Sequence, residues 1–258
     1  MATINEISKH TGIEGGHAKN VANLGVMLSR LQGFGTRYNP TQLAIKIPNL
    51  QTAFNSAGTT LTNVTTSKPP FTNAVNTRKQ LFDDMEKLST RGINAFDATQ
   101  GVTKAQVDDA KTYLRKIRGT RKDKKIIAPP APDATVPATP VQISASQQSY
   151  DQQVEHFAKL TALWASVPAY NPNETELQNA SLTAFLNQLK SANQAVITAT
   201  TPYLTAMQNR NNVLYADTTG IVALAEEVKK YVKSVSTITL AEFRQISGLK
   251  FTRPKKKK

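Results

Sequence analysis

Apolar residues recur at helical spacing along most of the chain. From His17 onward they are separated by three or four residues, and Gly33-Phe34-Gly35 follows the last of them. The run consists of Val21, Leu24, Leu28 and Leu31. This spacing puts one apolar stripe on one face of a helix, and the glycines are typical of its end. The pattern predicts an amphipathic helix from His17. Residues 1–16 show no sustained periodicity and are expected to form a flexible arm.

A later part of the chain repeats an earlier part. When the stretch from Tyr38 to Phe82 is shifted by 132 residues, ten of its 45 positions are identical. That is roughly three times what unrelated sequence would give. The first members of the identical pairs are Tyr38, Asn39, Pro40, Leu50, Asn55, Val64, Thr66, Pro70, Ala74 and Arg78. The helix from His17 has its own counterpart, one residue out of step, in Val154, Phe157, Leu160, Trp164 and Val167. The sequence therefore predicts two copies of one helical unit.

Prolines and capping residues predict where the other helices begin. Asn39-Pro40 and Asn171-Pro172 have the pattern of an N-cap followed by the first helical residue. Pro48 has no counterpart in the second copy, so the helix of the first copy is expected either to kink there or to start there. Pro69-Pro70 and Pro202 indicate a break and the start of a third helix in each copy. Thr103 and Thr239, each followed three residues later by Gln106 or Glu242, can form capping boxes.

The last helices of the two copies align in two ways. An offset of 118 pairs Tyr113 with Tyr231, and an offset of 129 pairs Ile117 with Ile246. Both alternatives stay open.

The segment between the copies contains five of the 13 prolines of the chain. Such a segment favours an extended, semi-rigid spacer. The expected fold is all-α, with two tandem pseudo-symmetric antiparallel bundles of about four helices joined by this linker. The expected boundaries are an arm at 1–16, a first bundle at 17–125, the linker at 126–145, a second bundle at 146–251 and a tail at 252–258.

The net charge of +14 is concentrated in two short clusters, one at the end of each copy. Seven basic residues lie between Arg115 and Lys125, and six lie between Lys250 and Lys258. The remaining sequence has 19 basic residues and, without Asp123, 17 acidic ones. The clusters consist of Arg115, Lys116, Arg118, Arg121, Lys122, Lys124, Lys125, Lys250, Arg253, Lys255, Lys256, Lys257 and Lys258.

Such clusters are typical of proteins that bind polyanions. Lysine and arginine can replace the counterions condensed on nucleic acid, whatever its base sequence. We expect sequence-independent binding of DNA or RNA, ribosomal RNA included. Because few aromatic residues are interleaved with the clusters, base-specific contacts are disfavoured. The alternative is a structural scaffold or self-assembling protein whose bundle faces bind a copy or a protein partner, while the clusters only keep it soluble. An anionic membrane surface is the least favoured partner.

Three other residues are candidate contacts. Arg78 and Arg210 stand at equivalent positions of the two copies, so each is expected either to cover the core with its stem or to make one phosphate or carboxylate contact. Trp164 stands in place of Leu31 and is expected to pack in the core rather than to stack on a base.

Signals for enzyme chemistry are poor. The histidines His10, His17 and His156 form no metal-binding pair, and the chain has no cysteine. His156 is expected to be a solvated residue on the flank of a helix. No nucleophile stands beside a base, so the sequence predicts no catalytic residue, no metal, no cofactor and no small-molecule substrate. The start of the chain lacks the features of a secretory signal, which favours a cytoplasmic protein.

Four segments resemble a family. Tyr-Asn-Pro, the run Arg210 to Tyr215 before Thr219-Gly220, the run Val228 to Ser234 and the run Ile246 to Phe251 are similar to segments of uncharacterised bacterial proteins. Those proteins carry one or two copies of such a helical unit. The resemblance covers most of the second half and, more loosely, the first, and it implies no activity.

Overall fold

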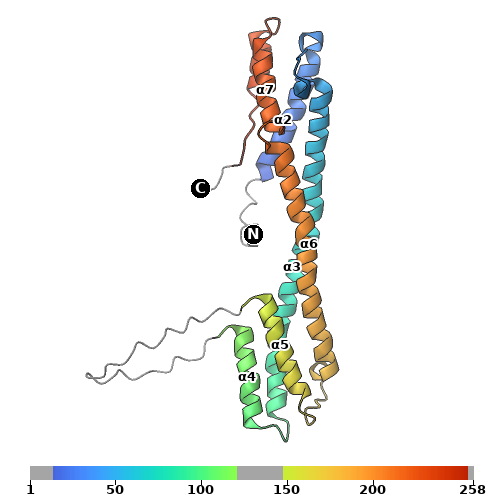
Figure 1. The fold of residues 1–258 in the computed structure, drawn as a ribbon, viewed down its shortest axis with the longest axis vertical. Helices are drawn as coiled ribbons and strands as arrows, with labels where there is room; N and C mark the ends of the chain where they lie inside the picture. Colours follow the sequence, from blue (N-terminus) through green and yellow to red (C-terminus); the bar gives the residue numbers. More distant parts are fainter. Residues whose placement is uncertain (1–13, 121–147, 255–258) are drawn as a thin grey trace, which may run out of the picture. The chain divides into compact units, whose positions relative to one another are not determined.

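The computed structural model describes residues 14–120 and 148–254, and within these ranges it is all-α (Figure 1). The described residues form seven α-helices, three short 3-10 helices and no strand, which confirms the expected fold class. The α-helices are α2 (Glu14–Gly33), α3 (Ile47–Asp97), α4 (Lys104–Arg118), α5 (Tyr150–Ala165), α6 (Asn179–Tyr215), α7 (Ile221–Ser234) and α8 (Leu240–Ser247). The 3-10 helices are η2 (Gly35–Arg37), η3 (Leu43–Ile45) and η4 (Thr175–Leu177).

The chain forms two compact units, whose boundaries differ from the expected ones. In the described residues, unit 1 comprises 14–71 and 199–254, and unit 2 comprises 72–120 and 148–198. Each unit thus takes residues from both halves of the chain, whereas the sequence predicted one closed bundle in each half. The cause is the length of α3 and α6, with 51 and 37 residues: each contributes one part to unit 1 and the other part to unit 2.

The core of unit 1 is built from both ends of the chain. Apolar residues of α2 and of the first part of α3 pack against residues of α7 and the end of α6. Its fully buried side chains include Leu24, Met27, Leu31, Leu50, Leu214, Ile221, Ala225 and Val228. In Figure 1, α2 and α7 lie beside each other in this unit. The first half of the chain therefore supplies only part of this core.

The core of unit 2 is built in the same manner. The end of α3 and the helix α4 pack against α5 and the first part of α6, and α4 lies beside α5 (Figure 1). Its buried side chains include Met85, Phe96, Ala110, Phe157, Leu160, Trp164, Leu182 and Leu189. Trp164 is fully buried against Gly92, which confirms the predicted packing role and removes the ring from contact with a base.

The predicted breaks at Pro69-Pro70 and Pro202 are wrong. All three prolines lie inside helices, and the ribbons of α3 and α6 run through them in Figure 1. A proline removes the hydrogen bond to the carbonyl four residues earlier, which costs a helix about 3 kcal/mol in its interior. Here the prolines are exposed, as are the residues that carry the affected carbonyls, so water can solvate those groups. On the buried side, Phe71 stacks on Tyr203 with ring centroids 5.3 Å apart, and this packing favours a continuous helix.

The second helix of each copy begins after the Asn-Pro pair. α3 starts at Ile47, next to Pro48, which agrees with one of the two alternatives for the first copy. α6 starts at Asn179 and not at Pro172, so the prediction for the second copy is wrong. A 3-10 turn precedes each helix instead. The hydroxyl of buried Tyr38 donates to the carbonyl of Ile45 (2.7 Å), and that of Tyr170 donates to the carbonyl of Leu177 (3.2 Å). These bonds hold the turns closed, and the two pairs are 132 residues apart.

The two predicted capping boxes are confirmed. Thr103 and Thr239 each cap a helix by a capping box with Gln106 or Glu242, at the starts of α4 and α8. α4 ends at Gly119, whose φ of +69° lies in the left-handed region that favours glycine. The start of α2 differs from the prediction, because the helix begins at Glu14 and includes two glycines in its first turn.

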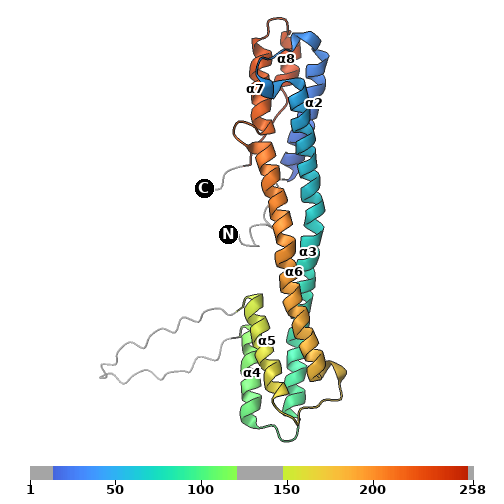
Figure 2. The same ribbon diagram turned by 45° about the vertical axis from the view of Figure 1, so that its right-hand side comes forward.

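An ion pair joins Glu242 of α8 to Arg37 of η2. Figure 2 shows α8 beside α7 in the same unit. The carboxylate of Glu242 accepts bonds from the guanidinium of Arg37 (2.8 and 3.1 Å) and from the backbone nitrogen of Thr239 (2.8 Å). These bonds, the one from Arg37 first, lower the pKa of Glu242 to about 2 from an ordinary 4.5. Its stabilising effect is therefore complete above the ordinary pKa and disappears as the pH falls toward 2.

We expect Glu242→Gln to lower the melting temperature by about 2 °C at pH 7, because the ion pair is exposed and screened. The difference from the wild type should shrink as the pH falls from 4.5 toward 2, because the carboxylate becomes protonated first in the unfolded and then in the folded state. Thermal melts followed by circular dichroism measure this. Glu226→Gln on α7 makes the same charge change at an exposed position, and an equal pH profile for both variants would contradict the assignment.

Several expected features lie outside the described residues: the arm up to residue 13, the basic residues from Arg121 to Lys125, the proline-rich segment, and the lysines from Lys255 to Lys258. Within the described ranges, no helix combines the length and apolar character needed to cross a membrane.

Candidate anion-binding site

The described part of the first basic cluster lies at the end of α4 in unit 2, where its charges are partly paired. Arg118 donates to Glu86 (2.9 Å) and to the hydroxyl of Thr90 (2.8 Å). Arg115 donates to the hydroxyl of Thr112 (2.8 Å). Since arginine and carboxylate neutralise each other, Arg118 contributes little field for a polyanion.

The described part of the second cluster lies against the start of α2 in unit 1. Asn20 donates to the carbonyl of Thr252 (2.7 Å) and accepts from its backbone nitrogen (3.0 Å), which fixes the segment after α8 along α2. Arg253 donates to the carbonyl of Tyr215 (2.7 Å), and its ion pair to the fully exposed carboxylate of Asp217 is 3.4 Å long. The side chain of Lys250 is exposed. In the sequence the four last lysines follow directly after this anchored segment.

The two units differ in charge. The described residues of unit 1 include twelve basic and five acidic residues, whereas those of unit 2 include eleven and ten. In unit 2, six cations form described ion pairs: Lys79 with Asp83, Lys87 with Asp84, Arg91 with Glu176, Lys111 with Asp97, Arg118 with Glu86 and Lys159 with Glu155. The excess of positive charge thus lies in unit 1, which the sequence clusters alone did not indicate.

Arg78 and Arg210 are both buried, but their surroundings differ. In unit 2 the guanidinium of Arg78 lies 3.9 Å from the centre of the Tyr150 ring, in cation–π geometry. In unit 1 Arg210 donates two bonds to the side-chain oxygen of Asn211 (3.2 and 3.0 Å). The structure therefore places the two arginines in different units, one covered by an aromatic ring and the other lining a pocket.

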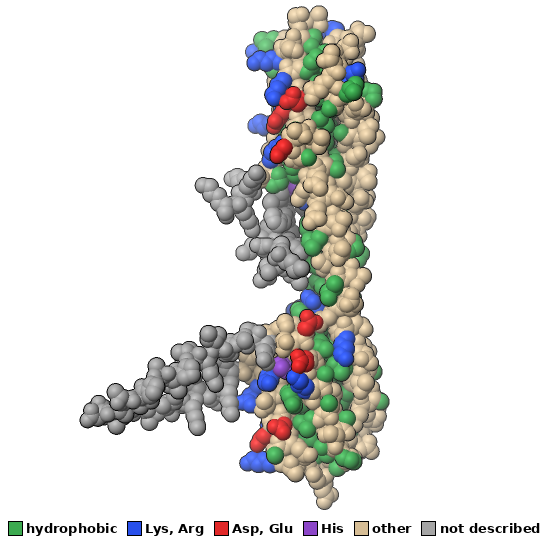
Figure 3. Space-filling view, in the orientation of Figure 1, with side chains coloured by type: hydrophobic (Ala, Val, Ile, Leu, Met, Phe, Trp, Pro, Cys, Tyr) green, Lys and Arg blue, Asp and Glu red, His purple; other side chains and the backbone are tan. Residues whose placement is uncertain are grey.

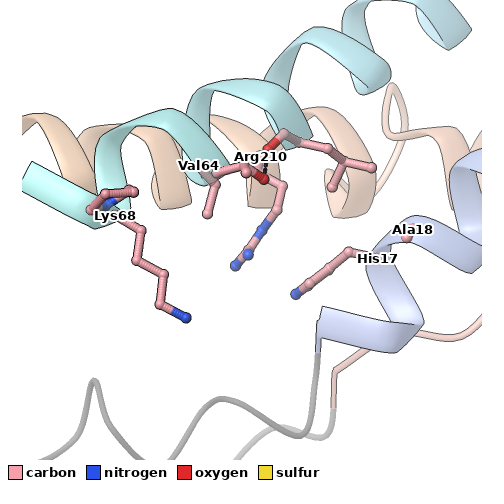
Figure 4. A pocket seen from close by; sticks show the side chains of 8 residues that line it. His17, Ala18, Val64, Lys68 and Arg210 are labelled. Carbon is pink, nitrogen blue, oxygen red and sulfur yellow. Dashed lines mark hydrogen bonds between the residues drawn. The ribbon is translucent and has the colours of Figure 1, made fainter. Parts of the chain in front are cut away.

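That pocket lies within unit 1 and has a volume of about 460 Å³. Figure 4 shows the end groups of Lys68, Arg210 and His17 pointing into the same space from α3, α6 and α2. The other lining residues are Ala18, Leu61, Val64, Thr65 and Pro69. Among the described residues that line it, three carry nitrogen-bearing side chains and none carries a carboxylate.

His17 and Lys68 were missed as site residues by sequence reasoning. His17 was considered only as a metal ligand, and nothing in the local pattern relates it to Lys68 or Arg210. His17 is buried, and its Nδ1 is 2.6 Å from the hydroxyl of Tyr215. Burial raises the pKa of that hydroxyl, so Tyr215 stays neutral and can serve as a hydrogen-bond donor. The one sequence signal for this pocket is the pair Arg78 and Arg210, which stand at equivalent positions of the two predicted copies.

The prediction for His156 is wrong. Its side chain is only 2% exposed. It lies on the buried side of α5 and not on a solvated flank. Burial, with the nearby charges of Lys116 and Lys159, lowers the pKa of His156 and favours the neutral ring.

Among the described residues, no group of three or more His, Asp or Glu side chains is placed to hold a metal ion. No family model, no curated protein and no solved structure matches the chain. The resemblance to bacterial proteins of the same helical pattern therefore stays an expectation from the sequence.

Proposed function

We propose that this protein binds nucleic acid without base specificity and without catalysing a reaction, and that unit 1 carries most of the binding. The observation that carries the proposal is the unequal charge: unit 1 has seven more basic than acidic residues in its described part, and unit 2 has one more. A polyanion is attracted to the unit with the larger unbalanced charge.

The anchored segment at 249–254 supports this assignment. Its bonds to Asn20 and Tyr215 hold Lys250 and Arg253 on the surface of a folded unit, beside the start of α2. Lysines that bind a phosphate backbone replace its counterions. When the lysines are attached to a folded unit, they lose less conformational entropy on binding than lysines on a free chain do.

We further propose that the chain consists of two copies of one helical unit. Each compact unit then contains one part of the first copy and one part of the second. Supporting observations are the matching tyrosine bonds of Tyr38 and Tyr170, and the stacking of Phe71 on Tyr203. Phe71 and Tyr203 are themselves equivalent residues at the offset of 132. A contact between two equivalent residues is expected where the two copies pack against each other.

A scaffold that assembles through bundle faces has less support. Four large apolar side chains are strongly exposed among the described residues: Val26, Leu43, Ile197 and Leu240. On the face shown in Figure 3, exposed hydrophobic side chains are small groups scattered among polar ones rather than one continuous patch. Self-assembly through such a surface would be weak.

Two variants with the same charge change test the proposal. In the first, Lys255, Lys256, Lys257 and Lys258 become glutamine; in the second, Arg121, Lys122, Lys124 and Lys125 become glutamine. We expect the first variant to bind a 30-nucleotide single-stranded DNA and a duplex of unrelated sequence about tenfold more weakly at low salt. Its plot of log affinity against log salt should also be shallower, because fewer counterions are released. Fluorescence anisotropy measures both.

The second variant should lose less affinity than the first. Equal losses would show that unit 1 does not dominate the binding. Unchanged binding in both variants, or no binding by the wild type at 50 mM salt, would reject nucleic acid as the partner. Sedimentation of the wild type at high concentration then tests the scaffold directly.

A further inference from the structure

Helix α8 and the anchored segment at 249–254 run along α2 and form one edge of unit 1 with it. Three hydrogen bonds set their register on the helix: Arg30 donates to the carbonyl of Gln245, Asn23 to that of Lys250 (2.7 Å), and Asn20 to that of Thr252 (2.7 Å). The numbers fall on α2 as they rise on the other strand of chain, so the two run antiparallel (Figure 1). The three bonds are spread over about 15 Å of α2, because the helix rises about 1.5 Å per residue.

Lys229 of α7 holds the anchored segment from the other side. Its amine donates to the carbonyl of Leu249 and lies 5.5 Å from the centre of the Phe251 ring. Burial lowers the pKa of Lys229, which agrees with an amine that is partly removed from water. The segment is thus fixed between two helices, and its residues keep a set spacing along the edge.

Exposed cations follow this edge. Arg244 precedes Gln245, Lys250 is bound through its carbonyl in the middle, and Lys19 precedes Asn20 on α2. Within the described ranges, none of these three cations forms an ion pair with a carboxylate. The ion pairs described in unit 1 use other cations: Asp217 with Arg253, Glu227 with Lys230, and Glu242 with Arg37. We call Lys19, Arg244 and Lys250 the cationic edge.

No aromatic ring is available to stack on a base. All nine phenylalanines, all seven tyrosines and the single tryptophan lie within the described ranges, and each of them is buried or half-buried. Proteins that bind single strands combine positive charge with exposed aromatic side chains on which the bases stack. This chain therefore offers charge without the stacking surface that single strands use.

We propose that the cationic edge selects the phosphate backbone of a double helix over single strands; this inference rests on the nucleic-acid binding proposed above. A duplex carries one charge per about 1.7 Å of its axis, so about 15 Å of it presents roughly nine phosphates to the edge, twice as many as one strand does. A duplex is also stiff, with a persistence length of about 150 base pairs. It loses little conformational freedom on a fixed row of cations, whereas a single strand must be ordered.

Competition on the full chain tests the preference. A labelled duplex DNA of 30 base pairs, bound at 50 mM salt, is displaced by the unlabelled duplex, by a 30-nucleotide oligo(dT) or by a strand of 30 abasic sites. We expect the duplex to compete at about tenfold lower concentration than oligo(dT), because it presents more phosphates. The abasic strand should compete as well as oligo(dT), because no base is contacted.

An RNA duplex of the same sequence separates the two sources of a double helix. It should compete within about threefold of the DNA duplex, because the edge contacts phosphates and not the groove. A difference of more than tenfold between the two duplexes would show that the protein reads the shape of a groove or the 2′-hydroxyl, and would contradict phosphate contact alone.

Two matched double variants locate the contact. Lys19→Gln with Lys250→Gln removes two charges from the cationic edge and keeps the bond from Asn23, which goes to the backbone of residue 250. Lys104→Gln with Lys190→Gln removes two exposed lysines of unit 2. The first variant should bind the duplex about tenfold more weakly, and its slope of log affinity against log salt should be smaller by about 1.8. The second should stay within twofold of the wild type.

Three results would overturn the inference in distinguishable ways. Equal competition by the duplex and oligo(dT), or weaker competition by the abasic strand than by oligo(dT), would reject the preference for a double helix but leave nucleic-acid binding in place. Equal losses in the two double variants would reject the cationic edge as the contact. Absence of binding to every probe would reject the proposed function itself.

Discussion

Residues 1–125 and residues 146–258, expressed separately, should each fail to unfold cooperatively as a monomer, and an equimolar mixture should regain a cooperative transition. The reason is that each compact unit takes part of its core from each half of the chain. Alone, the first half would expose the apolar faces of α2 and α3 that α6 and α7 cover in the full chain. Thermal melts followed by circular dichroism, with size-exclusion chromatography of each sample, measure this.

Chromatography is needed because a half could pair with a second copy of itself, as equivalent helices would replace one another. A half that unfolds cooperatively as a dimer would therefore agree with the proposal that each compact unit contains parts of both copies. If each half melted cooperatively as a monomer, near the temperature of the intact chain, two consecutive bundles would be the better description.

Gly92→Ala should lower the free energy of unfolding by about 3 kcal/mol, because no space exists for a methyl group there. A Cβ at Gly92 would lie 2.4 Å from Cη2 of Trp164, whose ring is fully buried. Urea unfolding followed by circular dichroism gives the loss. Trp164 is the single tryptophan of the chain, so its fluorescence reports the same transition from inside unit 2.

Gly58→Ala is the matched control in the same helix. No atom outside its own helical surroundings lies within 4 Å of an added Cβ at Gly58. Since alanine favours a helix over glycine, this variant should be more stable by about 0.5–1 kcal/mol. Destabilisation by both substitutions to the same degree would show that α3 tolerates no alanine for local reasons and that Trp164 is not responsible.

Local features of the fold could be predicted because they depend on neighbours in the sequence. The caps at Thr103 and Thr239 and the end of α2 at Gly33 follow from bonds and conformations within a few residues. The buried stripe of α4, consisting of Val107, Ala110, Leu114 and Ile117, follows from helical spacing.

The prolines show where local rules failed. Pro69, Pro70 and Pro202 predict breaks, yet α3 and α6 continue through them, because packing at Phe71 and Tyr203 and solvation of the affected carbonyls offset the lost bonds. Since the helices continue, each contributes residues to both compact units. The units therefore have other boundaries than the two consecutive bundles that the sequence predicted.

The sequence by itself determined that the chain is helical, where several helices begin and end, and that the basic residues are clustered. Only the tertiary structure decided that each compact unit combines residues of both halves of the chain and that unit 1 holds the unbalanced charge. It also decided that His17, Lys68 and Arg210 line one pocket. Periodicity records which face of a helix is apolar but not which apolar face it meets. Residues 51 and 142 positions apart therefore come together only through packing.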